Sequence, residues 1–111
     1  MISKETRDIV KKFRDDRNWS QFHNPKDLAI SLSLEASELL EIFQWSGDDL
    51  ECLDKLDQVK EELADVLSYS ILLADRYRLD LDEIIQAKMK KNAEKYPVEK
   101  ASGVSTKYTD L

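Results

Sequence analysis

Apolar residues recur at helical spacing along most of the chain. Ile9, Val10 and Phe13 share one face of a helix that is predicted to begin after Ser3, a good N-cap, and to end near Asp16. The segment 18–23 breaks this pattern and is predicted to be a loop.

A second helix is predicted to start at Asn24-Pro25, because Asn caps free amides and Pro suits the first helical position. Its apolar stripe continues to about Trp45, and Gly47 is expected to end it, since Gly accepts the left-handed conformation found after helices. A short acidic connection, residues 48–53, follows, with room for one helical turn.

A third helix is predicted from about Asp54 to Tyr77, and a fourth, capped by Asp80 or Asp82, to about Lys95. Residues 66–74 of the third helix are apolar nearly all round, which indicates burial on more than one side and a subunit interface.

These elements predict an all-α fold, a four-helix bundle that oligomerises. Residues 1–97 are expected to form a single helical domain. Residues 98–111 lack periodicity and are expected to be a tail, either flexible or packed on a partner subunit.

Composition narrows the class of protein. The 111 residues carry a formal net charge of -6 and no basic run, which argues against nucleic-acid binding. No stretch approaches the roughly 18 apolar residues that a membrane span needs, and no signal peptide is recognisable, so a cytoplasmic protein is expected. Cys52 is the only cysteine, and its acidic neighbours favour a buried, neutral thiol.

Two pairs of carboxylates stand out. Glu35 and Glu38 are three residues apart on the second helix, and Glu62 and Asp65 repeat this spacing on the third. Residues three apart lie about 60° from each other around a helix, so each pair shares a face. Both pairs sit among apolar residues, where carboxylates repel one another and burial disfavours their ionisation unless a cation is bound.

The short connection should pack these two helices antiparallel, so that the pairs could face each other across one groove. Four oxygen donors suit a hard cation, Mg²⁺ with Mn²⁺ as a possible substitute. Single pairs of this kind usually only solvate a helix surface, and spacing alone leaves both that interpretation and a metal site open. Glu41 points about 120° away from Glu35 and is a weaker candidate.

Other candidate residues could recognise a ligand. Aromatic side chains at helix ends, among them Trp19, Trp45 and Tyr69, could stack on a nucleobase, although core packing explains each of them as well. Lys88 and Asn92 are four residues apart on the fourth helix and could reach phosphate or sugar, or could be an ordinary exposed pair. His23 is the only histidine, which excludes a di-iron carboxylate bundle, because that bundle needs a Glu-x-x-His motif on two helices. No Ser/His/Asp or Cys/His triad can be argued from the sequence.

The two pairs, with 23 residues between Glu38 and Glu62, resemble the metal signature of the MazG-like all-α nucleoside triphosphate pyrophosphohydrolases. The resemblance is greatest to the dCTP pyrophosphatase branch. It extends in order over nearly the whole chain, through the segments 17–25, 41–45, 61–67, 88–92, 96–97 and 107–109.

The resemblance implies a role for each matching residue. Glu35, Glu38, Glu62 and Asp65 would bind Mg²⁺. In the mechanism we expect, one of these carboxylates accepts the proton of the attacking water, and Glu38 and Glu62 are the candidates because either could contact both metal and water. The other matching positions would bind substrate: Trp19, His23, Trp45 and Tyr69 at base and sugar, and Lys88 and Asn92 at phosphate or sugar. The reaction implied converts a (d)NTP, possibly dCTP, into the (d)NMP and pyrophosphate, in a homodimer or homotetramer.

Three alternatives stay open at this point. The chain could be a non-catalytic helical dimerisation or regulatory module, in which the carboxylates bind nothing. The same fold could act on dUTP or on damaged nucleotides, and the connection after Trp45, shorter than expected of animal dCTP enzymes, leaves broad specificity equally open. A phosphoribosyl-ATP type of hydrolase is a third reading, against which the aromatic residues argue.

Overall fold

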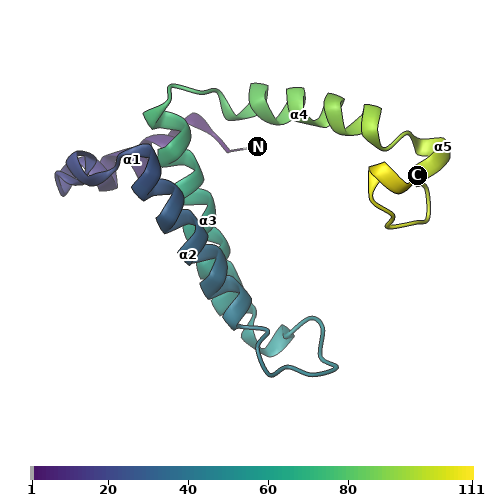
Figure 1. Cartoon of the computed structure of the whole chain (residues 1–111). Coiled ribbons are helices and arrows are strands. Elements are labelled where there is room, and N and C mark those ends of the chain that lie inside the picture. Colours follow the sequence, from purple (N-terminus) through teal and green to yellow (C-terminus); the bar gives the residue numbers. More distant parts are fainter. Residues whose placement is uncertain (1) are drawn as a thin grey trace. The chain divides into compact units, whose positions relative to one another are not determined.

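Helices make up every regular element of residues 2–111, the part of the chain that the computed structural model describes (Figure 1). The chain divides into two compact units, the first ending at Arg78 and the second running from Leu79 to Leu111. The first unit contains three α-helices and two short 3-10 helices: α1 (Lys4–Asp16), η1 (Trp19–Phe22), α2 (Pro25–Glu41), η2 (Leu53–Lys55) and α3 (Leu56–Arg76).

The predicted starts of the first two helices are confirmed. The hydroxyl of Ser3 accepts a hydrogen bond from the amide of Thr6 at 3.1 Å, and the side chain of Asn24 accepts one from the amide of Asp27 at 2.9 Å. Each cap satisfies one of the amides that the first helical turn leaves unpaired. Pro25 occupies the first turn of α2, where the missing N–H costs nothing.

The core of this unit lies where α2 packs against α3, and Figure 1 shows the two helices side by side and antiparallel. The buried apolar residues come from both helices and their connection: Leu28, Ile42, Cys52, Ile71, Leu72 and Ala74. Leu28 is only 1% exposed. Cys52 is buried, as predicted, and its thiol lies 3.9 Å from the carbonyl oxygen of Ile42.

The predicted elements differ from the structure in three places. Helix α2 ends at Glu41, because the amides of residues 42–44 bond to carbonyls three residues back and tighten the chain into turns before Trp45. Helix α3 begins at Leu56, after η2, two residues later than predicted. The segment 18–23, predicted to be a loop, contains η1.

The second unit consists of α4 (Leu81–Lys95), α5 (Val98–Ala101) and η3 (Tyr108–Asp110). Asp80 caps α4 by accepting a hydrogen bond from the amide of Glu83 at 3.2 Å. The expected tail thus contains short helices, and the Tyr96 and Tyr108 rings meet edge to face with centroids 5.9 Å apart. Whether residues 1–97 form one domain stays a prediction.

None of the helices in residues 2–111 is long and apolar enough to cross a membrane. The apolar second half of α3 is only partly covered within the chain. Ile71, Leu72 and Ala74 are buried, but Leu67, near the start of that half, is 44% exposed. The subunit interface expected there stays a prediction.

Candidate metal centre and ligand pocket

Three of the four predicted carboxylates come together where α2 packs against α3. Glu35 from α2 and Glu62 and Asp65 from α3 each place an oxygen within 4.8 Å of the others. The three-residue spacing directs Glu62 and Asp65 to one face of α3, and the antiparallel packing brings Glu35 opposite them. Three carboxylate oxygens at this separation could ligate one hard cation.

Glu38, the fourth predicted ligand, adjoins this group. Its exposed carboxyl is near enough to help raise the pKa of both Glu35 and Glu62. Among residues 2–111, the group whose oxygens lie within 4.8 Å of one another does not include Glu38. The roles predicted for Glu38 as metal ligand and as catalytic base therefore remain predictions.

The electrostatics of the cluster favour a positive charge. Burial raises the pKa of Glu35 from 4.5 to about 7, helped by the neighbouring Glu38 carboxyl and by repulsion from the other carboxylates. The pKa of Glu62 is also raised, first by the neighbouring Glu38 carboxyl and then by burial. In residues 2–111, Oε2 of Glu35 and Oε2 of Glu62 are buried without a hydrogen-bond partner. A bound cation would satisfy both oxygens and relieve the repulsion, so the residues present fit a metal ion.

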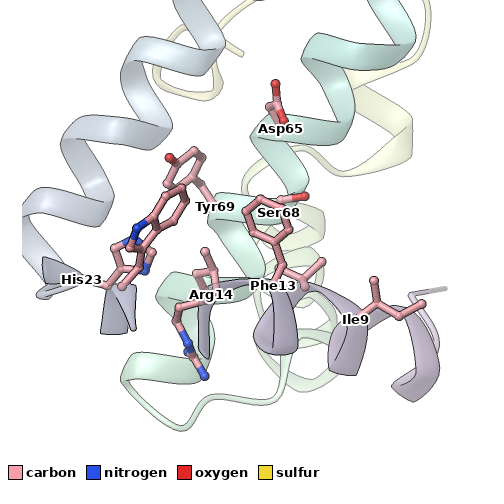
Figure 2. A pocket seen from close by; sticks show the side chains of 10 residues that line it. Ile9, Phe13, Arg14, His23, Asp65, Ser68 and Tyr69 are labelled. Carbon is pink, nitrogen blue, oxygen red and sulfur yellow. The ribbon is translucent and has the colours of Figure 1, made fainter. Parts of the chain in front are cut away.

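A pocket of about 300 Å³ lies next to the cluster, between α1, η1 and α3 (Figure 2). Its lining is mostly apolar and aromatic, with few polar groups, as is usual for small-molecule sites: Ile9, Val10, Phe13, Arg14, Trp19, His23, Asp65, Ser68, Tyr69 and Leu72. Asp65 belongs both to this lining and to the carboxylate cluster. The pocket and the cluster are therefore continuous.

Aromatic rings make up much of the pocket wall. The His23 and Tyr69 rings lie with centroids 6.4 Å apart, and Trp19 meets Phe13 edge to face at 5.8 Å. Burial and the nearby Arg14 guanidinium both lower the pKa of His23, so its ring is neutral near pH 7. A neutral ring offers one donor and one acceptor to a ligand, and in residues 2–111 its buried Nδ1 has no hydrogen-bond partner.

The remaining predicted binding residues lie elsewhere. Trp45 follows the end of α2, does not line the pocket and is 92% exposed. Lys88 and Asn92 lie on α4 in the second unit. The roles predicted for these three residues remain predictions.

Sequence reasoning missed the contribution of α1 to the pocket. Phe13 and Arg14 line it together with Ile9 and Val10, and Ser68 lines it from α3. The shared apolar face of Ile9, Val10 and Phe13 was the available signal, since an apolar face must pack against something. Nothing in the local spacing indicates that it packs beside the carboxylates.

Fold and site together define a class: an all-helical protein with a carboxylate cluster, suited to a divalent cation, beside an aromatic pocket for a small molecule. Comparison with known proteins makes the class specific. The model of the MazG-like family matches residues 30–111. The chain therefore belongs to the MazG-like family.

Individual relatives agree with this assignment. The chain is 38% identical to dCTP pyrophosphatase 1 of Bos taurus and to that of Homo sapiens, in each case over 112 aligned residues and 96% of this chain. It spans 66% of the length of these relatives. The crystal structure of a pyrophosphatase from Archaeoglobus fulgidus is similar with a TM-score of 0.78 and 46% identity, over 85% of this chain and 91% of that one.

Proposed function

We propose that this protein is a nucleoside triphosphate pyrophosphohydrolase, which converts a (d)NTP to the (d)NMP and pyrophosphate with Mg²⁺ as cofactor. The observation that carries the proposal is the position of Asp65, which is shared by the carboxylate cluster and the aromatic pocket. A nucleotide has the same two parts, a flat base and a metal-binding phosphate chain, joined by a sugar. The relatives named as pyrophosphatases support the same reaction.

Glu35, Glu62 and Asp65, with Glu38 beside them, would hold the metal ion. When bound, Mg²⁺ would lower the pKa of a water molecule and neutralise charge on the phosphate oxygens. Water would attack the α-phosphorus, and Glu38 or Glu62 would accept its proton. Because the reacting groups are held in place and their charge is neutralised, little further chemistry is required of the side chains.

The pocket would bind the base and sugar. Trp19 and Tyr69 offer ring faces or edges for packing, and His23 offers hydrogen-bonding nitrogens to a base edge. Lys88 and Asn92 lie in the second unit, and their contact with phosphate or sugar stays a prediction from the resemblance. The name of the mammalian relatives supports dCTP as the first substrate to test, with dUTP and damaged nucleotides as the next.

Self-association as a homodimer or homotetramer is part of the proposal. It is supported by apolar side chains that α2 and α3 leave open, such as Leu34 (59% exposed) and Leu63 (45% exposed). Size-exclusion chromatography with light scattering would measure the oligomeric state, and a monomer at micromolar concentration would contradict this part of the proposal.

The test is pyrophosphate release from a panel of canonical and modified dNTPs and NTPs, with Mg²⁺ and with EDTA. Mg²⁺-dependent release with a monophosphate as the second product would support the reaction, and the order of rates would identify the substrate. Absence of release from every triphosphate by a folded protein would favour the non-catalytic helical module.

A further inference from the structure

Helix α1 forms one wall of the pocket but is weakly anchored. From Lys4 to Asp16 no residue is buried. Its pocket-lining apolar side chains remain largely accessible, with Ile9 at 62% and Phe13 at 52% exposure. Because little apolar area is removed from water, packing alone contributes only modestly to holding this wall in place.

Asp75 on α3 ties α1 to the rest of the unit. Nη1 of Arg14 donates a hydrogen bond to its Oδ2 at 2.8 Å, and Nζ of Lys11 lies 3.7 Å from its Oδ1. Among residues 2–111 these are the ion pairs that join α1 to α3. The Arg14 side chain is 14% exposed, so its pair with Asp75 is better shielded from water than an ordinary surface pair.

The other partner of Arg14 does not serve this purpose. Asp15 accepts hydrogen bonds from Nε at 2.8 Å and from Nη2 at 3.2 Å, but Asp15 belongs to α1 itself. It therefore orients the guanidinium without attaching the helix to α3. Figure 2 shows Arg14 on the pocket wall at the end away from Asp65.

Asp75 itself does not line the pocket, and it lies ten residues beyond Asp65 on α3. It reaches the pocket only through Arg14. We propose that Asp75 is a positioning residue, which fixes the α1 wall of the pocket and so sets the affinity for the nucleotide. This inference rests on the proposed function.

The consequence differs from that of a catalytic residue. If Asp75 only positions the wall, removing its charge leaves the carboxylate cluster unchanged, and bound nucleotide still reacts at the normal rate. The free protein, however, samples positions of α1 that cannot bind, which lowers the apparent affinity. KM should therefore rise while kcat stays constant.

The experiment compares the whole chain with Asp75→Asn, Asp75→Glu and Asp16→Asn, using the best triphosphate of the panel with Mg²⁺. Asp75→Asn is expected to raise KM about three- to five-fold, which corresponds to the upper part of the range for single ion pairs. Asp75→Glu keeps the carboxylate and should stay within about two-fold of the parent. Asp16→Asn is the matched control, because it removes an ion pair that Asp16 forms with Lys12 within α1 at 2.6 Å.

Hydrogen–deuterium exchange gives a readout that does not depend on catalysis. Amides of residues 4–16 should exchange faster in Asp75→Asn than in the parent or in Asp16→Asn. An unchanged KM, or a fall in kcat with unchanged KM, would overturn the positioning role, as would unchanged exchange in α1. If the parent releases no pyrophosphate from any triphosphate, the proposed function fails, and the exchange result then decides whether Asp75 anchors α1.

Discussion

Replacing Glu35 by Gln should stabilise the metal-free protein at neutral pH. Glu35 is held among other carboxylates with one oxygen buried and unpaired, and its pKa is raised from 4.5 to about 7. A carboxyl whose pKa is higher in the folded than in the unfolded chain favours folding only while it is protonated. Its contribution is fully present below about pH 4.5 and is lost as the pH rises through about 7.

The size of the effect follows from this difference. At 1.36 kcal/mol for each tenfold change in the acid dissociation constant, ionising Glu35 in the folded chain costs about 3 kcal/mol at pH 7.5. The rest of its side chain keeps contact with solvent, so screening by water reduces this figure. We therefore expect Glu35→Gln to raise the free energy of unfolding by about 1–2 kcal/mol at pH 7.5 and by only a few tenths of that at pH 5.

Urea unfolding followed by circular dichroism, in EDTA at pH 5 and at pH 7.5, measures this directly. Saturating Mg²⁺ should reverse the order of stabilities at pH 7.5, because the parent gains binding free energy that the variant has partly lost. Glu41→Gln is the matched control, since Glu41 is exposed on the same helix and outside the cluster. A Glu35→Gln variant that is less stable than the parent in EDTA at pH 7.5 would refute the argument that these carboxylates repel one another.

Three other perturbations test the site and the fold. Asp65→Asn or Glu38→Gln should abolish turnover while the helical circular dichroism is retained, and full activity in either variant would contradict the proposed metal centre. Trp19→Ala should raise KM at least several-fold, because it removes a ring from the pocket wall, and kinetics with the preferred triphosphate would measure it. Leu28→Ala should lower the free energy of unfolding by about 3 kcal/mol, because the Leu28 side chain is 1% exposed; a loss below about 1 kcal/mol in urea unfolding would show that the core around it is loosely packed.

Capping residues made the helix starts predictable from the sequence. The side chains of Ser3, Asn24 and Asp80 each accept a hydrogen bond from the amide three residues further on. Contacts over so short a range can be predicted from the sequence. The end of α2 was not predictable in this way. Gly47 adopts the left-handed conformation expected of it, but Trp45 adopts it as well, and the turns begin earlier. Those turns accompany the burial of Ile42 and Cys52, a tertiary contact that local spacing does not encode.

The candidate site, too, could be predicted from the sequence only in part. Glu35, Glu62 and Asp65 could be singled out because each pair occupies a single helix and the short connection indicates antiparallel packing. Arg14 and Ser68 could not be, because their place in the pocket depends on how α1 packs against α3. Lys88 lies in the second compact unit, whereas the pocket lies in the first. Its predicted contact with phosphate or sugar therefore stays a prediction.

Asp65 lies one helical turn before Tyr69, so α3 fixes the distance between these two side chains. Four residues of helix separate the two by about 6 Å along the axis, which sets the spacing between a bound cation and the ring that would contact a base. Inserting one residue between them would turn Tyr69 by about 100° around the helix, so that Tyr69 and Asp65 would no longer face the same pocket. A change of length should therefore not be tolerated in this turn of α3, because it would separate the carboxylate that would hold the cation from the ring that would contact the base.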